Sequence, residues 1–110
     1  MALDVYMVDS VGRDPAAGFP SCSIVDRDHE FIFHGAGIDI DNCYPFLRRM
    51  IDFYADAQYG CDVLDSLIAE IDDVMQKISS VKSAVDTMQL FRDVCLAARE
   101  SGKSLILFCD

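Results

Sequence analysis

The run Leu105-Ile106-Leu107-Phe108-Cys109 is apolar at every position, which leaves few folds open to this chain. A strand of this kind is covered on both faces or flanked by neighbouring strands, so it belongs inside a sheet. Residues 3–8 alternate between apolar and mixed positions, as a strand with one buried face does. We therefore predict that these two segments pair with each other, so that residues 105–109 do not form an exposed edge.

Two further short runs, residues 22–25 and 30–34, are rich in β-branched and aromatic side chains. The polar segment 26–29 separates them, which predicts a β-hairpin with a four-residue loop. Residues 9–20 hold two Pro, two Gly and two Asp and are predicted to form a loop.

Three helices are predicted between the hairpin and the last strand, at about residues 44–58, 62–78 and 84–100. The first has a broad apolar arc, which predicts the most buried helix, with Asn42 or Asp41 as its N-cap. The second carries apolar and acidic side chains on opposite arcs. The third has Ser83 and Asp86 at the spacing of a capping box, and Gly102 follows as a stop signal.

The predicted order is β-β-β-α-α-α-β. This order indicates an α+β fold, in which three helices pack on a small, mainly antiparallel sheet. A chain of 110 residues, 52% of them hydrophobic, is expected to form a single domain over residues 1–110 with a core of its own. Phe53 and Phe91 lie at the centres of apolar helical arcs and are predicted core residues.

The cysteines at positions 22, 43, 61, 95 and 109 are odd in number, and no two have the C-x-x-C spacing. The first residues, Met1 to Asp4, lack the basic start of a signal peptide. No apolar run approaches the ~18 residues that cross a bilayer. These features predict reduced thiols and a cytoplasmic location.

Two glycine-containing segments resemble nucleotide-binding motifs but lack necessary parts. Gly102-Lys103-Ser104 would end a phosphate loop, but Ala97 stands where that loop needs glycine, and here the predicted helix precedes the strand. Gly35-Ala36-Gly37 lacks the third glycine of a dinucleotide fingerprint. Neither segment predicts a cofactor.

The residues that come nearest to a metal or acid–base site are Asp26, Asp28, His29, Glu30 and His34. On the predicted strand, His29 and His34 would fall on opposite faces, so they would not share a site. A calcium loop would need glycine where Phe31 stands. We therefore predict a solvated hairpin tip, with no catalytic residue and no metal. A small hydrolase or metal enzyme using residues 29–34 is the least favoured alternative.

Residues 50–76 contain seven acids and no Lys or Arg, and so contribute −7 to a net charge of −10. Like charges repel, so their concentration in one segment predicts a surface for a basic protein and disfavours nucleic acid and anionic membranes. Glu70 and Asp72 carry this prediction, because neither has a basic partner at helical spacing. A solvated face without a partner is the alternative. The predicted partner-binding residues are Asp52, Asp56, Asp62, Asp65, Glu70, Asp72 and Asp73, with Tyr54 and Tyr59 as aromatic anchors beside them.

In its size, its acidity and its β-rich start followed by acidic helices, the chain resembles the small, acidic, cytosolic immunity proteins of bacterial toxin systems. The resemblance implies that it binds and inhibits a basic toxin domain, often a nuclease, through the acidic residues named above. The sequence thus predicts an acidic protein-binding module that is not an enzyme. The alternative from another class is a homo-oligomeric domain of unassigned role, a homodimer for example, that associates through partly exposed apolar faces of the second and third helices.

Overall fold

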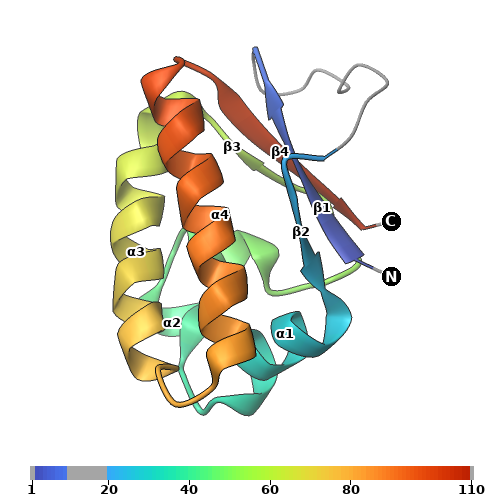
Figure 1. Ribbon diagram of the computed structural model, residues 1–110, viewed down its shortest axis with the longest axis vertical. Coiled ribbons are helices and arrows are strands. Elements are labelled where there is room, and N and C mark those ends of the chain that lie inside the picture. Colours follow the sequence, from blue (N-terminus) through green and yellow to red (C-terminus); the bar gives the residue numbers. More distant parts are fainter. Residues whose placement is uncertain (1, 10–19, 110) are drawn as a thin grey trace.

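The computed structural model describes residues 2–9 and 20–109, and its centre is a four-stranded antiparallel sheet (Figure 1). The strands are β1 (Ala2–Val8), β2 (Cys22–Val25), β3 (Ala57–Tyr59) and β4 (Ser104–Cys109), in the order β2-β1-β4-β3. β4 therefore lies between two strands, and Leu107 pairs with Val5 of β1 and with Ala57 of β3. The predicted pairing of the two ends of the chain is confirmed.

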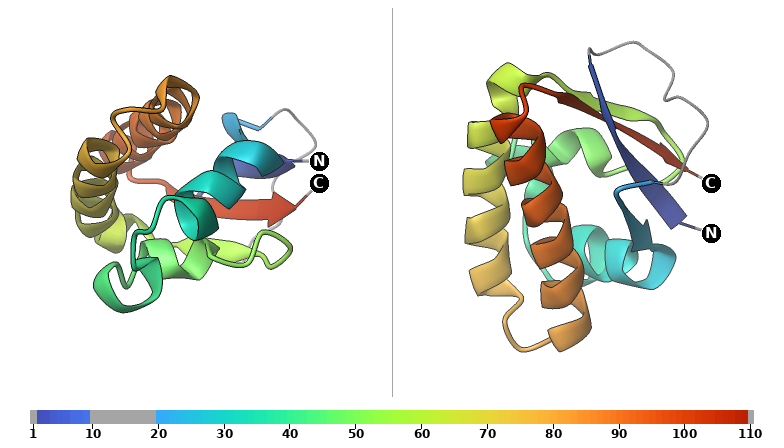
Figure 2. Two further views of the ribbon diagram at one scale, coloured as in Figure 1. Left: turned by 90° about the horizontal axis from the view of Figure 1, so that it is seen from below. Right: turned by 45° about the horizontal axis from the view of Figure 1, so that its top comes forward.

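Two long helices, α3 (Leu64–Lys77) and α4 (Lys82–Glu100), run side by side and cover one face of the sheet (Figures 1 and 2). Three shorter helical segments follow β2: α1 (Asp26–Glu30), which lies beside the start of α4, the π-helical turn η1 (Phe31–Gly35) and α2 (Ile40–Cys43). Two 3₁₀ turns complete the set, η2 (Leu47–Met50) and η3 (Cys61–Val63). The α+β class is confirmed. Within residues 2–9 and 20–109, no helix combines the length and the apolar character needed to cross a membrane.

The core lies between the sheet and the helix pair. Val5, Leu105 and Leu107 share the inner face of the sheet and are inaccessible to solvent, as is Phe91 on α4. Phe53 is also buried, so both predicted core phenylalanines lie in the core. α4 ends at Glu100, and the predicted stop signal Gly102 follows with a φ of +67°, a conformation that glycine adopts without steric cost. The amide of Lys103 bonds to the carbonyl of Ala98 (2.8 Å), a C-cap that turns the chain into β4.

The predicted hairpin of residues 22–34 is wrong in its second half. Residues 26–30 form α1 and residues 31–35 form η1, so segment 26–29 is a helix and not a strand connection. Ile32 and Phe33 are buried in the core, and Asp28 and His29 are buried as well, so this segment is not a solvated tip. A short apolar run fits either a strand or a buried helical turn, and here tertiary packing decided between them.

The predicted helix at residues 44–58 is also wrong. The chain there forms η2, a series of turns and then β3. α2 ends before Pro45, and its cap is Asp39, which accepts the amide of Asn42 (3.2 Å), rather than Asn42 or Asp41. The apolar side chains of residues 44–58 are buried against several parts of the protein and do not form one face of a helix. Proline removes one backbone donor, and the next two amides bond to another element, as described below.

The bounds of α3 and α4 agree with those predicted from the sequence, but their caps do not. α3 and α4 lie within two residues of their predicted positions. Ser83 and Asp86 do not form a capping box, because Val81 is the N-cap of α4 and makes no side-chain cap. Ser83 instead bonds to Asp28, and Asp86 bonds to Lys82. Most of the predicted loop at residues 9–20 lies outside the described residues.

Candidate functional site

An open pocket of about 390 Å³ lies between α1–η1 and the loop of residues 51–54. This volume is at the lower end of the range typical of small-molecule sites. Two segments that lie about twenty residues apart in the sequence form its walls. The lining residues are Asp26, His29, Glu30, His34, Ile51, Asp52, Phe53 and Tyr54.

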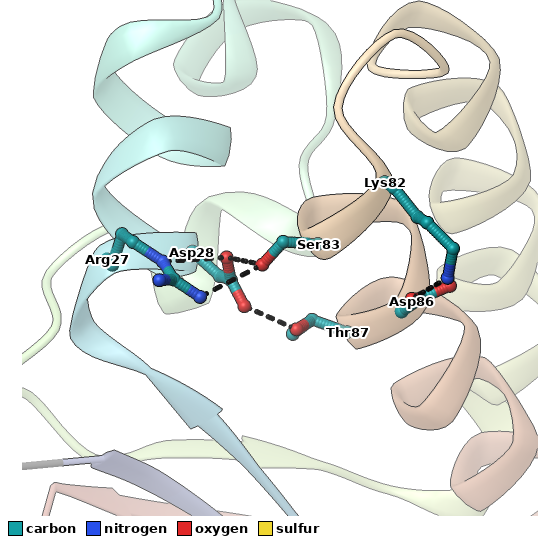
Figure 3. A network of polar contacts seen from close by, with 6 residues as sticks. All are labelled: Arg27, Asp28, Lys82, Ser83, Asp86 and Thr87. Atoms are coloured by element: carbon teal, nitrogen blue, oxygen red, sulfur yellow. Dashed lines mark hydrogen bonds and ion pairs between the residues drawn. The ribbon is translucent and has the colours of Figure 1, made fainter.

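A buried carboxylate fixes the α1 wall of the pocket to α4 (Figure 3). Asp28 is only 5% exposed and accepts hydrogen bonds from the hydroxyls of Ser83 (2.7 Å) and Thr87 (2.6 Å). Arg27 donates to the Ser83 hydroxyl (3.2 Å) and lies 3.7 Å from the Asp28 carboxylate. Residues three and four apart share a helix face, so Asp26, His29 and Glu30 line the pocket while Asp28 is directed to α4.

Two histidines attach the other wall through consecutive backbone carbonyls. The Nε2 atom of His29 lies 2.6 Å from the carbonyl oxygen of Met50, and that of His34 lies 3.2 Å from the carbonyl oxygen of Ile51. Their ring centroids are 6.1 Å apart. The predicted placement of His29 and His34 on opposite faces is therefore wrong. In a π-helical turn, residues five apart follow one another along the same side.

His29 is the most buried polar side chain of the pocket, at 1% exposure. Its ring stacks on Phe33, with centroids 4.5 Å apart, and meets Phe53 edge-on at 5.0 Å. Burial lowers the pKa of His29, and the hydrogen bond with Met50 opposes that shift only in part. A carbonyl accepts, so Nε2 carries the proton of the neutral ring. Nδ1 is then an acceptor, and among the described residues no buried side-chain nitrogen or oxygen lacks a hydrogen-bond partner.

The carboxylates at the pocket are Asp26, Glu30 and Asp52, and all three side chains are exposed. Within the described part of the chain, none of them forms an ion pair with Lys, Arg or His. Asp52 accepts the backbone amide of Tyr54 (3.0 Å), which turns the loop. Tyr54 is 69% exposed, with its ring edge-on to Phe53. The pocket is therefore negatively charged and has an accessible aromatic ring at its rim.

By contrast, the acids of α3 that face α4 are neutralised by it. Asp72 forms an ion pair with Arg92 (2.5 Å), and Asp65 forms one with Arg99 (2.7 Å). The sequence correctly shows no basic partner for Asp72 at helical spacing, and its partner Arg92 lies on the neighbouring helix α4.

Two other acids of α3 hold the segment that leads into η2. Glu70 accepts the backbone amides of Phe46 (3.1 Å) and Leu47 (2.9 Å), so it too has partners. Asp73 accepts the hydroxyl of Tyr44 and lies 3.5 Å from Lys77, which donates to the same hydroxyl (2.5 Å). Glu70 thus satisfies two backbone amides at the start of η2, and Asp73 fixes the side chain of Tyr44 to α3.

The other predicted site residues are dispersed. Tyr59 has no solvent exposure, and its hydroxyl donates to the carbonyl of Phe46 (2.7 Å), so it is a core residue and not an aromatic anchor. Burial raises the pKa of Tyr59 far above its usual range. Asp56 and Asp62 are exposed but do not line the pocket. Of the predicted partner-binding residues, the structure places Asp52 and Tyr54 at the pocket, together with Asp26, His29, Glu30 and His34.

The described residues contain no group of three or more His, Cys, Asp or Glu side chains that could hold a metal ion. Burial raises the pKa of Cys22 to about 11 and that of Cys95 to about 12, so both are protonated and weakly nucleophilic at neutral pH. The apolar faces of α3 and α4 pack in the core, with Met75, Val85 and Leu96 partly buried at its edge, and Leu90 is 58% exposed. What the pocket offers chemically is several hydrogen-bond acceptors and negative charge.

The chain was compared with models of protein families, with curated proteins and with solved structures, and none of them matches it.

Proposed function

We propose that this chain is a protein-binding module that docks on a basic protein through its pocket face, defined as Asp26, Glu30, Asp52 and Tyr54. One observation carries the proposal. Three carboxylates line a pocket that no described Lys or Arg lines, and none of the three forms an ion pair with a described residue. Carboxylates that lie close together repel one another, and a cation from a partner relieves that repulsion.

The rest of the pocket face supports the same function. Tyr54 is exposed beside the carboxylates, and an aromatic ring in this position is typical of a binding hot spot. The acids of α3 at positions 65, 70, 72 and 73 already have partners within the chain, so they offer less to another protein. The docking surface that we propose therefore lies at residues 26–54 rather than on α3.

Within this function, we propose the immunity class, in which the partner is a basic toxin domain whose cationic site the pocket face covers. The net charge of −10 supports this class, because complementary charge accelerates association and selects the partner. The test is growth of cells that express a basic toxin domain encoded beside this chain. Co-expression of the chain should restore growth, and a failure to restore it would contradict the immunity class.

Docking itself is tested with two variants of equal charge. The pocket-neutral variant carries Asp26→Asn, Glu30→Gln and Asp52→Asn. The far-end control carries Asp62→Asn, Asp93→Asn and Glu100→Gln, at exposed positions that do not line the pocket. Both remove the same charge, so a difference between them reports on the pocket and not on total charge.

The parent chain is used to isolate a partner from the source cells at low salt, and the purified partner is then titrated against each variant. We expect a basic partner that binds the pocket-neutral variant at least tenfold more weakly, with a smaller salt dependence, while the far-end control keeps most of the affinity. Equal affinity for the pocket-neutral variant and the parent would overturn docking through this face. An acidic partner would do the same.

A further inference from the structure

We propose that His29 and His34 form an acid-sensitive latch, which holds the loop of residues 51–54 against η1 and releases it when His29 is protonated. The inference goes beyond docking, because it concerns the free chain. The two rings bond to consecutive carbonyls of one backbone segment. The Nε2 atom of His29 lies 2.6 Å from the carbonyl oxygen of Met50, and that of His34 lies 3.2 Å from the carbonyl oxygen of Ile51. Two side chains from one turn thus hold the start of the loop.

The two sides of this contact are attached to the rest of the protein to different degrees. On the histidine side, Asp28 bonds to two hydroxyls of α4, and Ile32 is inaccessible to solvent. On the other side, residues 51–56 form no helix or strand, and Tyr54 is 69% exposed. Phe53 is buried, and its ring meets the ring of His29 edge-on. The loop is therefore the part that moves when the contact with the histidines breaks.

A charged ring is disfavoured while the loop is closed. His29 is 1% exposed, and its ring contacts Phe33 on one side and Phe53 on another. Protonation would place a cation among these apolar rings, where water cannot solvate it. Burial is accordingly the main cause that lowers the pKa of His29.

The charged and titratable groups around His29 act in both directions. From η1, His34 lowers the pKa of His29, because two cationic rings with centroids 6.1 Å apart repel each other. From α1, Asp26 and Glu30 raise it, as does the hydrogen bond to the loop carbonyl. Asp52 lines the same pocket from the loop. The three acids are exposed to water, and the net shift of the pKa of His29 is downward.

Acid therefore favours the open loop. In the open form the ring is in water, with its ordinary pKa of 6.5. Between pH 6.5 and the lower pKa of the closed form, the open form binds a proton that the closed form does not. The ratio of closed to open chains then falls by up to about tenfold for each pH unit. Opening moves Asp52 and Tyr54 away from Asp26 and Glu30, so the pocket face is lost in acid.

The test is NMR of the full chain between pH 7.5 and pH 5. The chemical shift of the His29 ring reports its protonation. The rings of His29 and Phe33 both lie on the segment formed by α1 and η1, with centroids 4.5 Å apart, so their NOE should persist. The NOE between His29 and Phe53, with centroids 5.0 Å apart, crosses to the loop and should disappear as the ring is protonated. The amide signals of β1 and β4 should remain those of the folded sheet.

Three variants sharpen this result. His34→Gln removes the neighbouring positive charge, so the midpoint of the transition should rise toward 6.5. The pocket-neutral variant removes acids that favour the charged ring, so its midpoint should fall. The far-end control removes the same charge elsewhere and should keep the midpoint of the parent.

Three results would overturn the latch. The first is an NOE between His29 and Phe53 that survives protonation of the ring. The second is loss of the folded signals of β1 and β4 together with those of the loop, because acid would then unfold the whole chain. The third is a ring that stays neutral down to pH 5. All three are measured on the free chain, so they do not depend on whether a partner docks through the pocket face.

Discussion

α3 and the pocket both carry several carboxylates, but the carboxylates have different roles. On α3, Asp65 and Asp72 pair with arginines of α4, while Glu70 accepts two backbone amides. At the pocket, Asp26 and Glu30 make no such contact with the described residues. The first group holds the fold together, and the second contributes only repulsion until something binds. An excess of acid in the sequence is therefore not the same as unneutralised charge on the surface.

The two regions also differ in how deeply their side chains are buried. α3 and α4 pack on the sheet through residues that solvent does not reach, whereas the pocket wall at residues 51–54 has solvent on one side. Two histidines bond to the carbonyls of Met50 and Ile51 at the start of this loop, and Phe53 packs in the core. We expect the scaffold to tolerate little change and the pocket to tolerate much more, and the predictions below test that expectation.

The largest effect is expected from truncating the core. Phe91→Ala should lower the free energy of unfolding by about 3–5 kcal/mol, because the ring is fully buried between α4 and the sheet. Phe53→Ala should cost less, because its ring borders the open pocket. Urea denaturation followed by circular dichroism measures both. Equal losses would mean that the pocket wall is packed as tightly as the scaffold.

A direct comparison of two glutamates comes next. Glu70→Ala leaves the amides of Phe46 and Leu47 without their acceptor, so it should cost about 1–3 kcal/mol. Glu30→Ala removes an exposed carboxylate that the fold does not use, so the free energy of unfolding should change by no more than about 0.5 kcal/mol. The same urea experiment applies. A loss at Glu30 as large as that at Glu70 would remove the distinction between the two regions.

The pH dependence of stability tests how the pocket wall is held. The folded-state pKa of His29 lies below its ordinary value of 6.5, chiefly because the ring is buried. Below pH 6.5 the unfolded chain therefore binds a proton that the folded chain does not, and stability falls as the pH drops toward the lower folded-state pKa. His29→Gln should reduce the loss of stability between pH 7.5 and pH 5. If the variant loses as much as the parent, His29 is not a source of this dependence.

The smallest expected effect is a change in melting temperature that has opposite signs when acids of α3 and acids of the pocket are neutralised. Asp65→Asn with Asp72→Asn should lower the melting temperature slightly, because both acids have arginine partners on α4. The pocket-neutral variant should melt at the same temperature or slightly higher, because it removes repulsion and the side-chain amide introduced by Asp52→Asn can still accept the backbone amide of Tyr54. The difference should shrink as salt is added. Differential scanning calorimetry at low and high salt measures this, and a fall in the melting temperature of the pocket-neutral variant would show that those acids stabilise the fold.

Long or continuous patterns were predicted correctly from the sequence. The apolar run in β4, the alternation in β1 and the amphipathic periods of α3 and α4 each extend over five or more residues of the observed element. Of the two short runs, residues 22–25 form the predicted strand and residues 30–34 do not. The segment Phe31-Ile32-Phe33 is compatible with a strand and with a buried helical turn. Residues 44–58 contain so many apolar side chains that a helical periodicity can be fitted to them although they form no helix. Tyr59 was predicted to be an exposed anchor because its burial depends on β3, which the sequence did not reveal.

The sequence by itself determined the α+β class, the central position of β4, the helix pair and the negative charge. Each of these depends on patterns within one segment or on a sum over the chain. Only the tertiary structure decided which carboxylates are neutralised and where the pocket lies. Arg92 meets Asp72 across two helices, and His29 meets the carbonyl of Met50 from twenty-one positions away. Contacts of this kind depend on how the elements pack, because local periodicity records which face of a segment is buried but not which residues lie against it.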